Sequence, residues 1–572
     1  MAFLAHRVSR GKKYWSIVES RRINGKPRQV ILEYLGTADT LLQRLKNDIK
    51  VSISSFSHGD TAALLNQAQK LDIVKIINKH VPAGPSGKKI IRDGLTIGAS
   101  FLLAAIGRAC HPTSKMGWYD WCKTTSLEYC LKSSFKTLDS QHFWDQMNAL
   151  PEEAIPRIEE EIVARLLEIY DISLDTLLYD TSNFFTFIDS SNKRCAIPQR
   201  GKNKQKRYDL RQIGMALLVS RKHQLPLFHK TYEGNKNDYT VFSETLNELS
   251  NRIKTISAEL QDITLVFDKG NNSKENFKKL ALQKLFYVAG LVPSHFKKLI
   301  KEANKNFAPI LIGDDKIPAW RVKREIWNEE RTCLVVISKQ LKEGQVRGIH
   351  QHLEKKYKAL EKLKKQLENP KSKNVLDKEE IESRLTKIIK GQFVEDILKY
   401  NLFTLDDGAM SFTYYIDYDA FEKLKNNVLG RKILVTNRHD WTNEEIILAY
   451  RGQAKVEYAF RTIKNPYHLA VRPQYHWTDQ KIKVHFLICI IGYLLTMVAY
   501  MEAKEKAGYK KSINSFMEGL KQVRLTCQIK KKSRKVKYQL EKIPRDIKKT
   551  AKVLGISDEN TRISIDVSGY DE

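Results

Sequence analysis

The stretch LDTLLYDTSNFF, residues 174–185, places a short apolar run directly before an aspartate, Asp180. Such a run, bounded by turn residues, predicts a buried β-strand. The segments after it alternate between strand and helix signals: apolar runs at 212–220 and 225–234, helical periodicity at about 239–256, ITLVFDKG at 263–270, a helix near 273–283, and LFYVAGLV at 285–292. This order predicts an α/β fold with a ribonuclease-H-like domain, although fold order alone does not establish an activity.

The charge of the chain indicates its partner. The sequence holds 98 Lys and Arg against 66 Asp and Glu, a net charge of +32, which predicts a polyanionic partner. A membrane surface is the alternative, but the uncharged stretch 486–501 is 16 residues long, shorter than the ~20 that cross a bilayer, and predicts a buried core helix. We therefore expect no membrane partner.

The cysteines and the N-terminal residues of the sequence indicate the cellular compartment of the protein. The seven cysteines are scattered without any C-x-x-C pair, and the chain does not open on a secretory signal. These features predict reduced thiols in a cytoplasm and no structural zinc.

A chain of 572 residues is too long for one core. We expect six segments: a basic N-terminal β module at 1–37, a helical domain at 38–170 that we expect to bind DNA, the first part of the α/β domain at 171–292, an insertion with strands and a helical hairpin at 293–440, the second part of the α/β domain at 441–510, and a basic tail at 511–572.

The stretch AYRGQAKVEYAFRTIK, residues 449–464, predicts a helix with one polar face. Thr442 and Glu445 have the spacing of a capping box, and Pro466 cannot continue the helix. At ~100° per residue, four further polar side chains fall within roughly 60° of Tyr450: Gln453, Glu457, Arg461 and Lys464. On its own such a face is more often a solvated one with spaced ion pairs, so a catalytic interpretation needs partners elsewhere.

Two aspartates provide those partners. Asp180 lies in the first strand and Asp268 ends the fourth, and these strands are neighbours in a sheet of this order. Each alone could be a strand-terminal cap. With Glu457 they form a set of three acids with no Cys or His cluster beside it, which suits magnesium or manganese. Two such ions roughly 4 Å apart can hold a phosphodiester between them.

These motifs together resemble a known family. Tyr450, Glu457 and Lys464 match the Tyr-x2-Arg-x3-Glu-x6-Lys signature of the DDE transposases of bacterial insertion sequences, in the insertion-sequence-four superfamily. Further matching motifs are DT at 180–181, DxG at 268–270, GN-x-x-D at 234–238, the stretch 475–495 and, for one longer-chain branch, the stretch 14–36. The resemblance covers residues 1 to about 510.

The resemblance implies a reaction and its partners. It implies metal-dependent DNA strand cleavage and strand transfer at the terminal inverted repeats of the element itself, with Asp180, Asp268 and Glu457 as catalytic and metal-binding residues. It also implies double-stranded DNA as substrate, a homodimer, no small-molecule substrate, and a place on DNA in the cytoplasm of a bacterial or archaeal cell. The alternative is a catalytically inactive or domesticated DNA-binding protein of the same fold.

The family also implies how DNA is held. The signature Tyr and Lys grip phosphates, here Tyr450 and Lys464, supported by an arginine whose place Gln453 takes. Arg461 or Arg451 could replace that cation. A tryptophan of the insertion often stacks on a flipped base, and the candidates are Trp320, Trp327 and Trp441, each of which is otherwise a core aromatic.

A basic loop follows the first strand. The stretch GKNKQKRYDLRQ at 201–212 offers a set of cations to DNA phosphates: Lys202, Lys204, Lys206 and Arg207. Ordinary surface charge is the alternative for any one of them. Recognition of the terminal repeats would fall to the N-terminal β module, the helical domain, or both.

Overall fold

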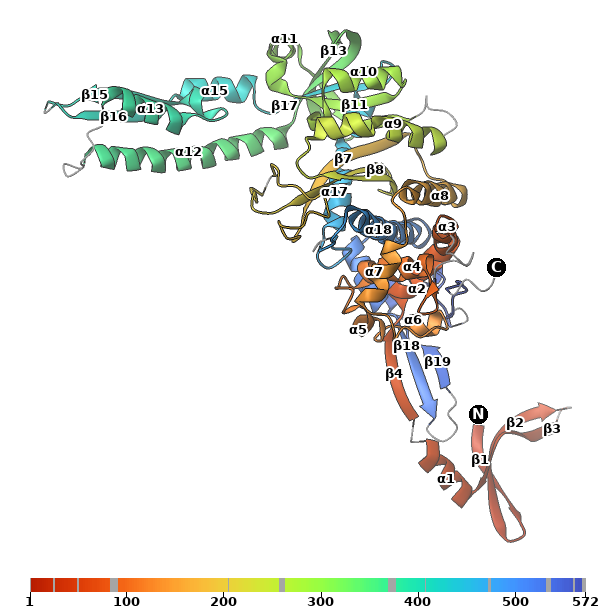
Figure 1. The fold of residues 1–572 in the computed structure, drawn as a ribbon. Coiled ribbons are helices and arrows are strands. Elements are labelled where there is room, and N and C mark those ends of the chain that lie inside the picture. Colours follow the sequence, from red (N-terminus) through yellow and green to blue (C-terminus); the bar gives the residue numbers. More distant parts are fainter. Residues whose placement is uncertain are drawn as a thin grey trace. The chain divides into compact units, whose positions relative to one another are not determined.

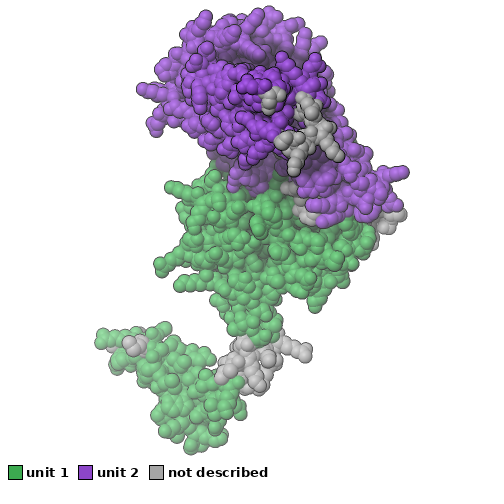
Figure 2. Space-filling model, turned by 90° about the vertical axis from the view of Figure 1, so that its left-hand side faces the viewer, with its two compact units in different colours: residues 1–165, 463–471, 480–572 green, residues 166–462, 472–479 purple. Residues whose placement is uncertain are grey.

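The chain divides into two compact units, which Figure 2 colours separately. Unit 1 comprises residues 1–165, 463–471 and 480–572, and unit 2 comprises residues 166–462 and 472–479. The computed structural model describes residues 2–23, 26–48, 51–82, 91–203, 205–256, 263–368, 377–406, 408–471, 475–530, 536–558 and 561–567.

Unit 2 is built on a nine-stranded sheet of order β12-β13-β14-β17-β11-β10-β7-β8-β9 (Figure 1). Its centre contains the five strands expected from the sequence, with α9 (Asp238–Ile256) and α10 (Lys274–Leu282) between them in the chain. These strands are β7 (Thr176–Phe185), β8 (Gln212–Ser220), β9 (Pro226–Glu233), β10 (Thr264–Phe267) and β11 (Phe286–Leu291). β7 pairs parallel with β10 and antiparallel with β8. The predicted ribonuclease-H-like α/β order is confirmed.

Both faces of the central strands are covered, which explains their continuous apolar sequence. On one face Tyr179 packs against Phe242 of α9, with ring centroids 5.0 Å apart, and Phe267 lies 4.8 Å from the same ring. On the other face α16 (Asn443–Arg451) packs on β10, β11 and β17. Side chains alternate along a strand, so the residues that follow Tyr179 and Phe267 face α16.

The segment predicted as a separate insertion contributes to the main sheet. Strands β12 (Ala308–Ile312), β13 (Asp315–Ile326), β14 (Glu329–Ile337) and β17 (Arg431–Thr436) all extend it. Because β17 pairs with β11 and β14, the chain leaves the sheet after β14 and returns to it in β17.

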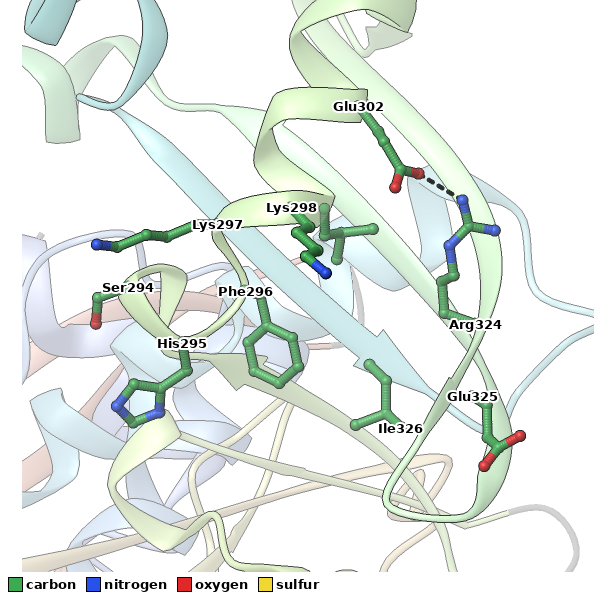
Figure 3. A pocket seen from close by; sticks show the side chains of 10 residues that line it. Ser294, His295, Phe296, Lys297, Lys298, Glu302, Arg324, Glu325 and Ile326 are labelled. Carbon is green, nitrogen blue, oxygen red and sulfur yellow. Dashed lines mark hydrogen bonds and ion pairs between the residues drawn. The ribbon is translucent and has the colours of Figure 1, made fainter.

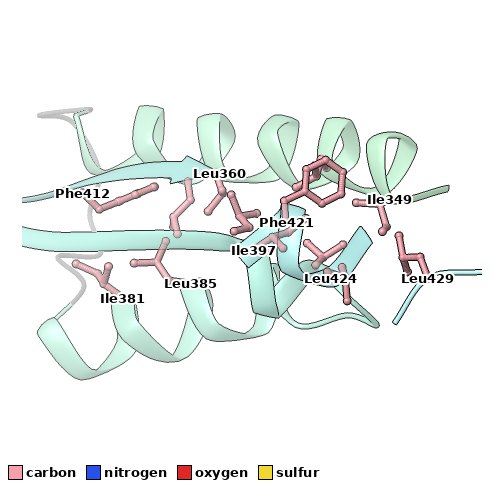
Figure 4. Packing of buried hydrophobic residues seen from close by; sticks show 13 residues of the cluster. Ile349, Leu360, Ile381, Leu385, Ile397, Phe412, Phe421, Leu424 and Leu429 are labelled. Atoms are coloured by element: carbon pink, nitrogen blue, oxygen red, sulfur yellow. The ribbon is translucent and has the colours of Figure 1, made fainter. Parts of the chain in front are cut away.

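Between β14 and β17 lies a lobe with its own core (Figure 4). Its elements are α12 (Lys339–Leu367), α13 (Lys378–Ile389), α14 (Val394–Ile397), β15 (Leu398–Thr404), β16 (Met410–Ile416) and α15 (Tyr418–Asn427). Ile349, Leu353, Leu360 and Leu363 of α12 are buried in this core. The lobe is not a bare helical hairpin, however, because α12 packs on β16 and α13 on β15, with Phe412 of β16 in the shared core.

Unit 1 contains the expected N-terminal sheet and the helices that follow it. Strands β1 (Ala2–Ser9), β2 (Lys12–Ile23) and β3 (Lys26–Thr37) form an antiparallel sheet, followed by α1 (Ala38–Asp48). The further helices are α2 (Gly59–Lys70), α3 (Ile73–Lys79), α4 (Ile97–Cys110), α5 (Trp118–Cys122), α6 (Leu127–Cys130), α7 (Ser140–Asn148) and α8 (Ala154–Ile169), the last of which continues into unit 2.

The apolar stretch 486–501 lies within α18 (Asp479–Ala507). This helix is long and apolar enough to cross a membrane by length and composition, yet 94% of its most apolar window is buried inside the protein. Apart from Asp479 it is grouped with the helices of unit 1, so the predicted second part of the α/β domain at 441–510 is divided between the units.

The residues predicted as a basic tail are folded. They form α19 (Ile513–Lys521), β18 (Arg524–Lys530), β19 (Val536–Leu540) and α20 (Arg545–Val553). β18 pairs antiparallel with β4 (Val51–Ser57), which joins the end of the chain to its beginning. The sequence signal is the alternation of polar residues with the buried Leu525 and Cys527.

Candidate active site

Asp180 and Asp268 occupy equivalent positions on adjacent parallel strands. The β10 and β7 register pairs Val266 with Leu178, and each aspartate follows two residues later. Adjacent strands lie ~4.8 Å apart, so the two carboxylates emerge side by side on the face that α16 covers. Both side chains are half-buried.

The third acid comes from a helix that begins where the sequence predicts. Thr442 and Glu445 form the expected capping box of α16. The helix does not run unbroken to residue 464, because a turn at Gly452 separates α16 from α17 (Gln453–Ile463). A Cβ on Gly452 would lie 2.8 Å from the Ala449 carbonyl oxygen and 3.1 Å from Leu178, so the glycine permits close approach to β7.

Gln453 anchors α17 to the strand that carries Asp180. Its side chain is buried, and its Nε2 donates a 3.0 Å hydrogen bond to the carbonyl oxygen of Tyr179. The expectation that Gln453 faces DNA with Glu457 is therefore wrong, because the helix turns this residue towards β7. Glu457, one turn later, is exposed and has no hydrogen bond or ion pair to any described residue.

Tyr450 contacts the second aspartate directly. Its hydroxyl donates a 2.9 Å hydrogen bond to Asp268 Oδ1. Gly290 of β11 makes room for this hydroxyl, since a Cβ there would lie 2.4 Å from it. Burial raises the pKa of Tyr450, and the neighbouring charge of Asp268 raises it further, so the phenol keeps its proton and remains a donor.

Negative charge accumulates around Asp180. Burial raises the pKa of Asp180 to about 7, and the charges of Asp268, Asp238 and Glu457 add to the rise, while a backbone hydrogen bond from Thr181 opposes it. Asp268 and Glu457 therefore both lie within electrostatic range of Asp180. A carboxyl group in this position is stabilised in its charged form by an added cation.

Asp238 is a fourth acid at this place. It begins α9 and accepts a 2.7 Å hydrogen bond from the Thr181 hydroxyl, and a Cβ on Gly270 would lie 3.2 Å from its Oδ2. Asp238 of the GN-x-x-D motif thus contacts both Thr181 of the DT motif and Gly270 of the DxG motif. The GN-x-x-D spacing is the sequence signal for this residue.

The chemistry of these donors fits a hard divalent cation. Asp180, Asp268 and Glu457 offer carboxylate oxygens, the ligands that magnesium and manganese prefer. Within the described part of the chain, no group of three or more His, Cys, Asp or Glu side chains is gathered closely enough to hold a metal ion. Of the three acids, Glu457 is exposed, whereas Asp180 and Asp268 are half-buried.

The predicted DNA-binding cations are dispersed. Lys202, Lys206 and Arg207 are exposed on the loop between β7 and β8, and Arg207 pairs with Asp209 at 2.6 Å, whereas Lys204 lies outside the described residues. Arg461 is exposed on α17, with its guanidinium 5.9 Å from the ring of Tyr458. Lys464, half-buried, follows α17 directly but belongs to unit 1.

The three candidate tryptophans differ in their surroundings. Trp327 lies in the turn between β13 and β14 and packs 4.7 Å from Phe277, as a core aromatic does. Trp320 and Trp441 are half-buried, and each lies near an arginine, Arg324 or Arg438.

A cavity of about 440 Å³ lies in unit 2 between the start of α11 (Lys297–Asn306) and the end of β13 (Figure 3). Phe296, Lys298 and Ile326 line it, and Arg324 forms a 2.5 Å ion pair with Glu302 at its edge. None of the site acids lines this cavity.

Comparison with known families decides the class of protein. Residues 185–495 match the model of the transposase DDE domain, which covers more than half of the chain, and residues 6–56 match the N-terminal domain of IS1634 family transposases. The chain is a transposase of the DDE family. DNA transposition is therefore the process in which it acts, and transposases of the DDE family generally use divalent metal ions.

Two further comparisons concern curated proteins and solved structures. No curated protein matches the transposase. Among solved structures, it is similar to a piggyBac transposase synaptic complex with hairpin DNA, at 12% identity and a TM-score of 0.38, covering 80% of this chain and 79% of the other. A Mos1 transposase paired-end complex matches at 8% identity and a TM-score of 0.15, covering 26% and 50%.

Sequence reasoning missed one cation of the transposase. Lys432 of β17 is half-buried, and burial lowers the pKa of its ammonium group, while the charges of Asp268 and Glu457 oppose that change. No motif marks this lysine, because it stands in an ordinary strand pattern, RKILVT, some 25 residues before Glu457.

Proposed function

We propose that this transposase cleaves and joins DNA strands at the terminal inverted repeats of its own insertion sequence in a magnesium-dependent reaction, for which manganese can substitute. The observation that carries the proposal is the alignment of Asp180 and Asp268 on adjacent strands, with Glu457 close enough to influence the charge of Asp180. Asp180, Asp268 and Glu457 would hold two ions.

When bound, such ions supply a nucleophilic hydroxide and stabilise the leaving oxygen of a phosphodiester. The chain itself positions the groups around them. Gln453 fixes α17 on β7, and the neutral phenol of Tyr450 orients Asp268 through its hydrogen bond. Water would cleave one strand, and the freed 3′-hydroxyl would then attack a phosphodiester in line. No covalent protein nucleophile is needed.

The partners follow from the same proposal. The substrate is double-stranded DNA, both transposon ends and target, and a net charge of +32 favours its binding. Joining two ends requires two active sites, so we propose a homodimer as the smallest active assembly. The reaction would take place on DNA in the cytoplasm.

The test is cleavage of a duplex that carries the inverted repeat read from the DNA flanking the coding sequence. We expect nicking with Mg²⁺ or Mn²⁺, and no nicking in EDTA. Asp180→Asn and Asp268→Asn should each lower the cleavage rate by at least about 10³-fold, because each removes a metal ligand, while DNA affinity is retained. Asp209→Asn, on the exposed loop, is the matched control and should cleave normally.

Three outcomes contradict the proposal. If the wild-type chain binds the repeat but never cuts it, the protein is an inactive DNA-binding relative. If cleavage ignores the inverted repeat, the protein is a nuclease without end specificity. Persistent cutting by Asp268→Asn would show that the assigned acids are wrong.

A further inference from the structure

The signature helix of this transposase lacks a free cation beside its acids. Gln453 stands where the family signature has arginine, and its side chain is buried against the Tyr179 carbonyl group. Arg451 extends towards Asp315, at 3.9 Å, and Arg461 lies over Tyr458. Beside the charge of the proposed metal ions, any positive charge that the chain itself brings to a phosphate at the acids must then come from another element.

Strand register places such a charge at the same end of the sheet. The β10 and β11 register pairs Val266 with Val288, so Asp268 is level with Gly290. Gly290 in turn pairs with Leu434 of β17. Residues that pair across strands point to the same face, so Leu434 shares the face of Asp268, Gly290 and the Tyr450 hydroxyl.

Lys432 is two residues before Leu434 and therefore points to this same face. β17 runs antiparallel to β11, so Lys432 lies beyond the level of Gly290, towards the carboxyl ends of β7, β10 and β11. Ligands of open α/β sheets bind just outside those ends.

The ammonium group of Lys432 has no hydrogen-bond or ion-pair partner among the described residues. The charges of Asp268 and Glu457 nevertheless act on it. The positive charges of Lys269 and Arg451 disfavour the charged form of Lys432 and lower its pKa. A half-buried lysine without a partner is costly, and an anionic ligand would offset that cost.

We propose that Lys432 binds a non-bridging oxygen of the DNA phosphate at the cleavage site and supplies the positive charge that Gln453 does not. This inference rests on the proposed function. A lysine ammonium group acts as a point charge and needs no fixed fork geometry, so it can follow the phosphate as the bond breaks.

The experiment compares Lys432→Met, Lys432→Arg and the control Lys323→Met on the inverted-repeat duplex. Lys323 is an exposed lysine of β13 in the same sheet, paired with Glu330. We expect Lys432→Met to lower the cleavage rate at saturating DNA and Mg²⁺ by about 30-fold or more, while the Kd for DNA changes less than about threefold. Lys432→Arg should recover most of the rate, and Lys323→Met should match wild type.

A modified duplex separates phosphate contact from a structural role. A methylphosphonate at the cleaved position removes the charge of one non-bridging oxygen. The rate ratio of native to modified duplex should be at least about tenfold larger for wild type than for Lys432→Met. If Lys432→Met does not fold, Lys432→Gln takes its place.

The results distinguish two failures. If wild type cleaves, Asp268→Asn does not, and Lys432→Met cleaves like Lys323→Met, this inference is wrong and the proposed function stands. If the rate ratio of native to modified duplex is the same for wild type and Lys432→Met, this inference is also wrong. A loss confined to DNA affinity overturns it as well. If wild type does not cleave, the proposed function itself fails.

Discussion

The Tyr450 hydroxyl donates a 2.9 Å hydrogen bond to Asp268 Oδ1 and so joins α16 to the end of β10. The contact depends on Gly290, whose missing side chain leaves room for the phenol. A signature residue of the helix and an acid of the sheet are thus fixed to each other.

Removing the hydroxyl should impair cleavage. Tyr450→Phe loses a hydrogen bond to a charged group, worth about 1.5–3 kcal/mol, so we expect a rate at least about tenfold lower. Gly290→Ala should have a similar effect, because the new Cβ would displace the hydroxyl. The double variant should be no slower than the worse single one, as measured by single-turnover cleavage; additive losses would contradict this coupling.

Gln453 should contribute to stability. Gln453→Leu leaves the Tyr179 carbonyl group without its side-chain donor, which should lower the free energy of unfolding by about 1–3 kcal/mol. Urea denaturation followed by circular dichroism measures the change. Gln205→Leu, on the exposed loop after β7, is the control, and equal stability of the two variants would refute a structural role for Gln453.

Gly234 should be irreplaceable for folding. A Cβ there would lie 1.9 Å from the Gln212 carbonyl oxygen, so Gly234→Ala must force β8 and β9 apart. We expect a loss of more than about 3 kcal/mol or failure to fold. Gly348→Ala in α12, where a Cβ meets no atom within 4 Å, should instead be neutral or slightly stabilising in the same unfolding assay.

Acid should destabilise unit 1. Burial lowers the pKa of His58 and of His468 to about 4, and it also lowers the pKa of His485. In the unfolded chain these histidines bind protons near pH 6.5, whereas in the folded chain they stay neutral down to a lower pH. Their contribution to the free energy of unfolding is therefore fully present above pH 6.5 and decreases as the pH falls towards 4. Each contributes about 1.4 kcal/mol per pH unit.

Thermal unfolding of the full chain between pH 7 and pH 5, without divalent ions, measures this dependence. Exposed His295 gives the control, since His295→Gln should leave the slope unchanged. A melting temperature of the unit 1 transition that stays constant over this range would contradict the prediction.

The sequence alone determined the central fold and singled out the three acids as candidates. The order of strands and helices between 174 and 292, and the capping box at Thr442, follow from local periodicity and side-chain chemistry, which act over a few residues. The neighbouring positions of Asp180 and Asp268 follow from that order, because few topologies accommodate it.

Only the tertiary structure decided which polar residues face the site. Helical periodicity placed Gln453 with Glu457, but the turn at Gly452 and the Tyr179 carbonyl group draw it into the core. Lys432 lies near the acids through strand pairings across β17, β11 and β10, and the folded C-terminal segment pairs with β4 from far away in the chain. Such pairings depend on contacts between distant segments, which no local pattern specifies.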